Sequence, residues 1–130
     1  MYLEINKEIG MATLKHDENV VGTLKFDTCY STEEQSNENI SAIMFKSNDL
    51  YKKITVKDFL KKLLITLWEE GEGFSGKRPF GNSEWKYDMY AELIKRGIIE
   101  GRLDKYENKY IEELDEKVAD KFVIDFIKKL

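Results

Sequence analysis

Hydrophobic and polar residues alternate near the start of the chain, in two runs on either side of a polar tetrad. The runs are Met11–Lys15 and Val20–Phe26, and the tetrad is residues 16–19. A period of two places successive side chains on opposite faces, so the pattern predicts two half-buried strands joined by a turn. Gly22 interrupts the second run and indicates a bulge. The face of that run predicted to be buried carries Val20, Leu24 and Phe26.

The next part of the chain is polar. Residues 28–39 lack the apolar side chains needed to bury a face, which predicts a loop between strands. Residues 40–45 then form a short apolar run that predicts a third strand, and residues 46–49 have the composition of a turn.

Apolar residues recur at helical spacing after residue 55, in the most regular pattern of the chain. Thr55 is placed to cap this helix, Asp58 follows three residues later, and Gly71 is a typical C-terminal residue. Apolar positions three and four residues apart predict one buried stripe. The stripe comprises Val56, Phe59, Leu60, Leu63, Leu64, Leu67 and Trp68.

Two further helices are predicted towards the C-terminus. Ser83 is placed to cap a helix that runs to Arg96, and Gly97 with Ile98 is typical of a Schellman ending. Asp115 is placed to cap the last helix. The predicted inner faces comprise Trp85, Met89, Tyr90, Leu93 and Ile94 in the first of these helices, and Val118, Ala119, Phe122, Val123, Phe126, Ile127 and Leu130 in the second.

Two short runs between these helices predict a hairpin. They are residues 98–103 and 109–114, and they flank the polar residues 104–108. The fold class is therefore α+β, with N-terminal antiparallel strands followed by a helix–loop–helix–hairpin–helix core. A helix followed by such a hairpin is similar to the recognition helix and wing of winged-helix proteins.

Length and composition favour one domain. A chain of 130 residues with 42% hydrophobic residues has enough apolar material for one core and little length for two. We expect a single domain over residues 1–130, in which residues 1–50 form a strand-rich extension and residues 51–130 a helical core. The formal net charge is −4. An acidic chain is poorly suited to broad binding of a phosphate backbone, although it leaves room for a local basic patch.

Several chemistries lack the residues they need. The chain has one cysteine and one histidine, which excludes an intrachain disulfide and a cysteine zinc cluster. A nucleophilic pair would require His16 and Cys29 to meet. No signal-peptide pattern and no apolar run of membrane-spanning length is visible. We therefore expect a cytoplasmic protein that is not an enzyme and that needs no metal, cofactor or membrane.

The loop between the first two predicted helices has a distinctive composition. Residues 71–83 hold four glycines, two phenylalanines, two adjacent cations and the only proline. They match a phosphate-loop pattern formally, but Arg78 stands where a Ser or Thr should hold magnesium, and Pro79 stands where a helix should begin. A rigid connector and a ligand- or partner-binding loop both remain open. The candidate binding residues are Phe74, Ser75, Lys77, Arg78, Phe80, Asn82 and Ser83.

This loop also carries a family resemblance. Residues 68–83 read Trp-Glu-Glu-Gly-Glu-Gly-Phe-Ser-Gly-Lys-Arg-Pro-Phe-Gly-Asn-Ser, and Trp85 follows. The segment resembles the signature of small uncharacterised proteins encoded by bacteriophages and prophages. The resemblance covers residues 56–130 and continues through Tyr90, Leu93, Ile94, Gly97, Gly101 and Asp115. It implies a phage or prophage origin and transfers no activity, because that family has no established function.

A nucleic-acid interface is a further hypothesis. The predicted helix before the hairpin carries cations at its end. An α-helix is narrow enough to enter the major groove of DNA, where such cations can contact the duplex. Acidic residues on the same surface would repel phosphates. The candidate nucleic-acid-binding residues are Lys95, Arg96, Arg102 and Lys105.

We therefore expect a non-enzymatic phage or prophage accessory protein that binds a macromolecular partner, either a host or a phage protein. An inhibitor of a host defence system is one form of this function. Two alternatives stay open, namely small-ligand or phosphate binding by residues 73–83, and a winged-helix-like DNA-binding module.

Overall fold

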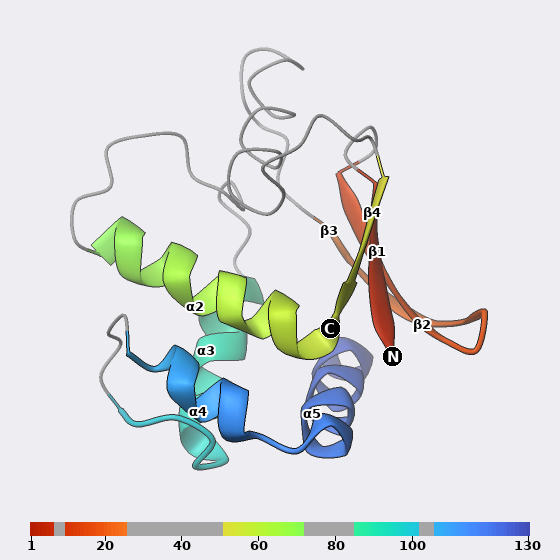
Figure 1. Ribbon diagram of the computed structural model, residues 1–130. Helices are drawn as coiled ribbons and strands as arrows, with labels where there is room; N and C mark the ends of the chain where they lie inside the picture. The colour runs from red at the N-terminus through yellow and green to blue at the C-terminus, as the bar shows by residue number, and fades with distance from the viewer. Residues whose placement is uncertain (7–9, 26–50, 72–84, 102–105) are drawn as a thin grey trace, which may run out of the picture. The chain divides into compact units, whose positions relative to one another are not determined.

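The computed structural model describes residues 1–6, 10–25, 51–71, 85–101 and 106–130 (Figure 1). These residues fall into two compact units, one of strands before residue 56 and one of helices from residue 56 onward. The α+β class predicted from the sequence is confirmed. The loop, third strand and turn predicted within residues 28–49 lie outside the described residues, as does Phe26.

The described strands form an antiparallel sheet in the order β3-β2-β1-β4. They are β1 (Tyr2–Asn6), β2 (Met11–His16), β3 (Asn19–Lys25) and β4 (Tyr51–Thr55). The hydrophobic–polar pattern predicted β2 and β3 but not β1 or β4. In β1 the buried Leu3 and Ile5 alternate with Glu4, a period of two that could have been found. β4 contains one fully apolar aliphatic residue, Ile54, and its pairing with β1 is a long-range contact that no local pattern reveals.

The buried face of the sheet is built from alternate positions on neighbouring strands. Leu3 lies opposite Leu14 on one side and Ile54 on the other. Ile5 lies opposite Ala12, which in turn lies opposite Leu24 on β3. Apolar cross-strand pairs of this kind set the register, because a one-residue slip would turn every one of them to the opposite face. The buried residues of the sheet are Leu3, Ile5, Ala12, Leu14, Leu24 and Ile54.

A two-residue turn joins β2 and β3. Asp17 and Glu18 have φ angles of 48° and 69°, so both stand in the left-handed region. Two consecutive positive φ angles are the requirement of a type I′ turn, whose twist matches that of the flanking strands. The polar tetrad predicted as a turn is therefore confirmed, and its two central residues carry the bend.

A bulge beside Gly22 changes which side chains of β3 are buried. Leu14 pairs with Gly22, whereas Lys15 pairs with Val20, so Val21 is the additional residue. The bulge shifts the alternation and places Val20 on the face opposite Leu24. Val20 is accordingly 61% exposed. The predicted bulge is confirmed, and the prediction that Val20 shares a buried face with Leu24 is wrong.

The turn offers a test of its backbone conformation. We expect Glu18→Gly to raise the free energy of unfolding by about 1 kcal/mol, because glycine adopts the left-handed φ of residue 18 without the steric cost of a Cβ. Glu18→Ala is the matched control, since it removes the carboxylate but keeps the Cβ and therefore the steric cost of the left-handed φ. Urea denaturation of the full chain measures both variants. Equal stabilities of the glycine and alanine variants would contradict the turn geometry.

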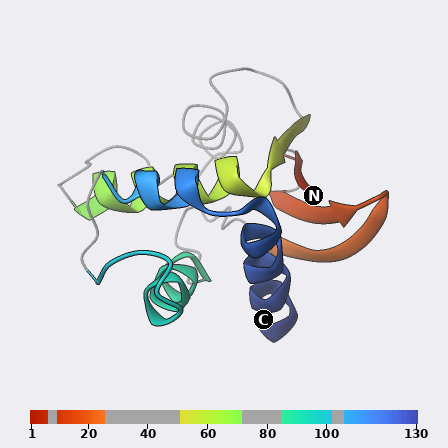
Figure 2. The same ribbon diagram turned by 60° about the horizontal axis from the view of Figure 1, so that its bottom comes forward.

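The second unit consists of helices. They are α2 (Val56–Gly71), α3 (Trp85–Lys95), α4 (Asn108–Glu113) and α5 (Glu116–Lys129), shown in Figures 1 and 2. The three helices predicted from helical spacing are confirmed as α2, α3 and α5, although Ser83 lies outside the described residues. α2 packs against α4 and α5, and the ring of Phe59 stacks on that of Trp85, which joins α2 to α3.

The hairpin predicted within residues 98–114 is wrong. Residues 98, 99 and 101 form bends, residues 102–105 lie outside the described residues, and α4 replaces the second strand. Glu107 and Ile111 are buried and Leu114 is half-buried, and this spacing of four and three residues is helical. A short apolar run does not distinguish strand from helix by itself. The described residues therefore contain no wing of the winged-helix kind.

The predicted helix ends of α3 and α5 are confirmed. Gly97 has a φ of 73°, its N–H donates to the carbonyl of Ile94, and the N–H of Ile98 donates to that of Leu93. Those two bonds define the Schellman motif. At the start of α5, the Asp115 carboxylate accepts from two backbone N–H groups of the first turn at 2.9 and 3.3 Å.

The cores of these helices differ from the predicted stripes at a few positions. Along α5 the stripe is buried at Ala119, Phe122, Val123, Phe126 and Ile127. Val118 and Leu130 at its two ends are exposed. Two ionisable residues, Lys86 and Glu107, are buried instead, which the apolar pattern did not predict.

Candidate functional site

Most of the site residues predicted from sequence lie outside the described residues. This holds for the seven loop residues Phe74, Ser75, Lys77, Arg78, Phe80, Asn82 and Ser83, and for Arg102 and Lys105. His16 is exposed at the end of β2, and Cys29 is not described. Lys95 and Arg96 are described, at the C-terminal end of α3. The candidate site within the described residues therefore lies around Arg96, where α3 ends.

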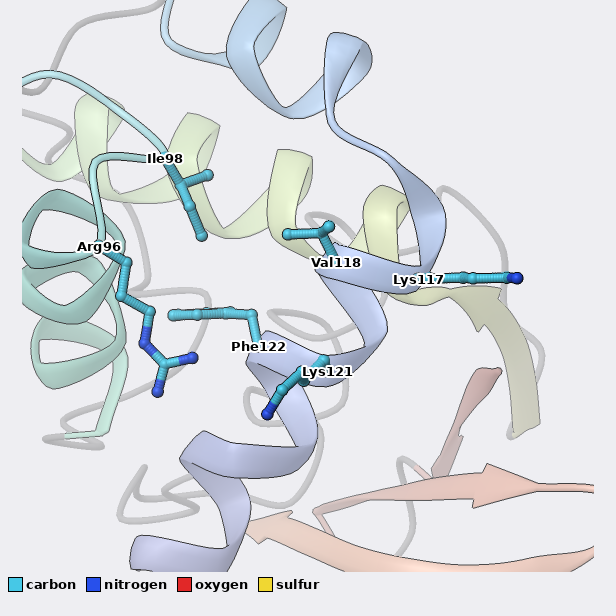
Figure 3. A pocket seen from close by; sticks show the side chains of 6 residues that line it. All are labelled: Arg96, Ile98, Lys117, Val118, Lys121 and Phe122. Atoms are coloured by element: carbon cyan, nitrogen blue, oxygen red, sulfur yellow. The ribbon is translucent and has the colours of Figure 1, made fainter.

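A pocket lies between the C-terminal end of α3 and the N-terminal half of α5. Its volume is about 340 Å³, near the lower limit of the range for ligand pockets. Three of its residues are cationic and three are apolar. The lining comprises Arg96, Ile98, Lys117, Val118, Lys121 and Phe122 (Figure 3).

The two helix ends position these side chains. Beyond α3, the left-handed Gly97 reverses the chain, so that Arg96 precedes the bend and Ile98 follows it. In α5, the cap at Asp115 sets the start of the helix. Residues four apart lie one above the other on a helix. Lys117 and Lys121 therefore form one row along the edge of the pocket, with the ammonium of Lys117 directed away from the hollow, and Val118 and Phe122 form a second, neighbouring row (Figure 3).

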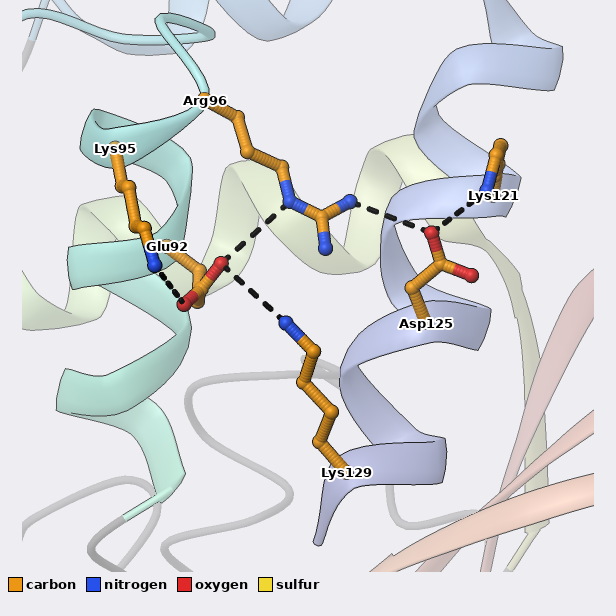
Figure 4. A network of polar contacts seen from close by, with 6 residues as sticks. All are labelled: Glu92, Lys95, Arg96, Lys121, Asp125 and Lys129. Carbon is orange, nitrogen blue, oxygen red and sulfur yellow. Dashed lines mark hydrogen bonds and ion pairs between the residues drawn. The ribbon is translucent and has the colours of Figure 1, made fainter.

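Arg96 connects the two helices. Its guanidinium carbon lies 5.1 Å from the centroid of the Phe122 ring, a cation–π geometry. Its Nε is 3.5 Å from a carboxylate oxygen of Glu92 on α3, and its Nη1 is 3.5 Å from one of Asp125 on α5 (Figure 4). Three contacts from two helices hold the guanidinium plane in one orientation beside the pocket.

Further cations gather around the same two carboxylates. Lys121 donates to Asp125 at 2.8 Å. Lys95 and Lys129 lie 3.9 and 4.0 Å from the carboxylate of Glu92. We name this group the α3–α5 ion cluster, and its members are Glu92, Lys95, Arg96, Lys121, Asp125 and Lys129. Cations outnumber carboxylates, so the cluster is locally positive in a chain whose formal net charge is −4.

Asp125 stays ionised inside this cluster. The hydrogen bond from Lys121 lowers the pKa of the Asp125 carboxyl, and the charges of Lys121 and Arg96 lower that pKa further. The group is solvent-accessible, so these pairs orient side chains more than they stabilise the fold. Lys117 differs from the other pocket cations, because in the described part of the chain its side chain makes no ion pair.

Comparisons of the chain with protein-family models, with curated proteins and with solved structures found no match. Within the described ranges, no group of three His, Cys, Asp or Glu side chains is placed to hold a metal ion. None of the helices described is long and apolar enough to cross a bilayer. What the site does chemically must therefore be inferred from its own side chains.

The sequence contained part of the signal for this pocket. Lys117 and Lys121 stand four residues apart beside two members of the apolar stripe of α5, Val118 and Phe122. That spacing places two cations along the edge of an apolar face. The stripe was predicted to lie wholly in the core, and the two lysines were not among the predicted site residues. The contribution of Arg96 and Ile98 depends on how α3 packs beside α5, which spacing along the chain does not show.

Proposed function

We propose that this protein is a non-enzymatic accessory protein of a phage or prophage that binds a protein partner in the cytoplasm of a bacterial host. The observation that carries the binding role is the pocket between α3 and α5, with its apolar centre and cationic border. The phage context rests on the resemblance carried by residues 56–130. An inhibitor of a host defence system is one form of this function, and the identity of the partner decides it.

The composition of the pocket supports a protein partner. The centres of protein interfaces are apolar, and arginine is enriched among the residues that contribute most to affinity. The Arg96 side chain is already held by Glu92, Asp125 and Phe122. Ordering it on binding therefore costs little additional side-chain entropy.

Nucleic acid is less well supported by the same geometry. Arg96, one of the two described cations predicted to contact DNA, is engaged by two carboxylates, and the other, Lys95, lies 3.9 Å from the carboxylate of Glu92. Glu92 and Asp125 would stand close to any phosphate that approached Arg96, and the repulsion would offset much of the attraction. Ligand binding by residues 73–83 concerns a part of the chain outside the described residues, and no described contact favours it.

Site-specific photo-crosslinking in bacterial cells tests the proposal. A photoreactive amino acid in place of Val118, which is 48% exposed, is expected to form a discrete covalent adduct with a protein. The same substitution at Tyr87 on α3, 54% exposed and outside the pocket lining, is the control and should not form this adduct. Mass spectrometry identifies the partner.

Three results would contradict this function. An adduct that nuclease treatment removes would make the partner a nucleic acid. The same adduct from positions 87 and 118 would place the interface elsewhere. The absence of any adduct from position 118 would leave the pocket without a partner in the cell.

A further inference from the structure

The apolar centre of the pocket has room for one large side chain from another molecule. Ile98 and Val118 extend towards the same hollow, and the ring of Phe122 forms its inner wall (Figure 3). Val118 is 48% exposed although it belongs to the apolar stripe of α5, whereas Phe122 is 1% exposed. An aliphatic or aromatic side chain placed there would remove the exposed surface of Val118 and Ile98 from water, which is favourable.

The border of the pocket attracts negative charge. Lys117 has no ion-pair partner among the described residues, and the side chain of Lys121 is 76% exposed. Lys121 and Arg96 both pair with Asp125. The single negative charge of that carboxylate does not neutralise the two positive charges together. A segment carrying carboxylates would therefore be drawn to this border, and a basic segment would be repelled.

The arrangement distinguishes an acidic peptide from a nucleic acid. Bases bind proteins by stacking on exposed aromatic faces, and Phe122 is buried beneath the guanidinium of Arg96. A nucleic acid also has no flexible aliphatic group with which to fill the space between Ile98 and Val118. Carboxylates on a peptide, by contrast, can flank a leucine or phenylalanine at the spacing of neighbouring residues.

We infer that the pocket recognises a short acidic segment of a partner protein that presents a large apolar side chain between its carboxylates. The apolar side chain lies between Ile98 and Val118, and the carboxylates pair with Lys117 and Lys121. This inference rests on the proposed function, because it names the chemistry of the partner at the same site.

Fluorescence anisotropy with labelled synthetic peptides and the full chain tests the inference. The probe is a short peptide in which aspartate and glutamate flank a central leucine–phenylalanine pair. Two comparison peptides replace the central pair by serines, or the acids by asparagine and glutamine. Only the first is expected to bind, and its affinity should fall as the salt concentration rises.

Substitutions of pocket residues test whether the acidic apolar peptide binds at the pocket. Lys117→Glu and Val118→Asp are each expected to weaken binding of the acidic apolar peptide by about tenfold or more. Lys128→Glu is the matched control, because Lys128 is exposed on the same helix and lies outside both the pocket and the ion cluster. It changes the net charge as Lys117→Glu does, and it should leave the affinity within about twofold.

Each contrary outcome has a separate meaning. Equal binding of the serine peptide, or an equal loss in Lys128→Glu, would overturn the inference. No binding up to about 1 mM peptide would also overturn it. If photo-crosslinking at position 118 still yielded its protein adduct, the proposed function would stand with a different partner chemistry, whereas loss of both results would reject both.

Discussion

Replacing Phe122 by alanine is expected to lower the free energy of unfolding by about 3–5 kcal/mol and to remove the inner wall of the pocket. The side chain is 1% exposed, and its ring stacks against that of Phe126 with centroids 6.5 Å apart. Truncation would leave a cavity and would withdraw the ring on which the Arg96 guanidinium rests. Urea denaturation followed by circular dichroism measures the loss of stability.

Phe126→Ala separates stability from binding. Phe126 is 4% exposed on the same helix and does not line the pocket. We expect a loss of stability similar to that of Phe122→Ala, with peptide affinity retained at temperatures where the variant is folded. Phe122→Ala should lose binding under the same conditions. A Phe122→Ala chain within about 1 kcal/mol of the original stability would show that this ring is not a core residue.

Gly97→Ala is expected to destabilise the chain by about 1–2 kcal/mol. Among the described residues, and apart from the glycine itself and its immediate neighbours along the chain, no atom lies within 4 Å of the position that a Cβ would occupy at residue 97, so crowding is not the cause. The cause is the φ of 73°, which L-amino acids with a side chain adopt at a cost. Relief of that strain would move Arg96 and Ile98, so we also expect weaker binding of the acidic apolar peptide. Thermal or urea unfolding provides the measurement.

Gly101 provides the matched control. A Cβ at residue 101 also meets no atom of the described residues within 4 Å beyond its immediate chain neighbours, but the φ of Gly101 lies outside the left-handed region. Gly101→Ala should therefore leave stability unchanged or raise it by about 0.4–1 kcal/mol, because alanine restricts the unfolded chain. Equal destabilisation by both substitutions would contradict the conformational explanation for Gly97.

The location of the pocket shows how an acidic protein can present a positive surface. Residues 1–46 contain 8 Asp and Glu against 4 Lys, which accounts for the formal net charge of −4. The remaining residues are balanced, and the fold gathers four of their cations around Glu92 and Asp125. The net charge of a chain therefore does not predict the sign of a particular surface.

Local sequence patterns predicted the elements whose signals are local. The β2–β3 hairpin follows from a polar tetrad between two alternating runs, and α2, α3 and α5 follow from apolar spacing. The glycine ending of α3 and the aspartate cap of α5 depend on single residue types at single positions, so both were predictable. The error at α4 arose in a short run, where Ile111 and Leu114 suit either a strand or a helix.

Local patterns were sufficient to predict the α+β class, the principal helices and the two helix ends that border the pocket, because apolar spacing and capping residues act within a few residues of the chain. The face of β3 that bears Val20 depends instead on pairing between strands, since pairing with β2 sets the bulge. The candidate site likewise depends on contacts between elements that are distant along the chain. Arg96 meets Phe122 and Asp125 only when α3 packs beside α5, and spacing along a chain does not specify which helices become neighbours.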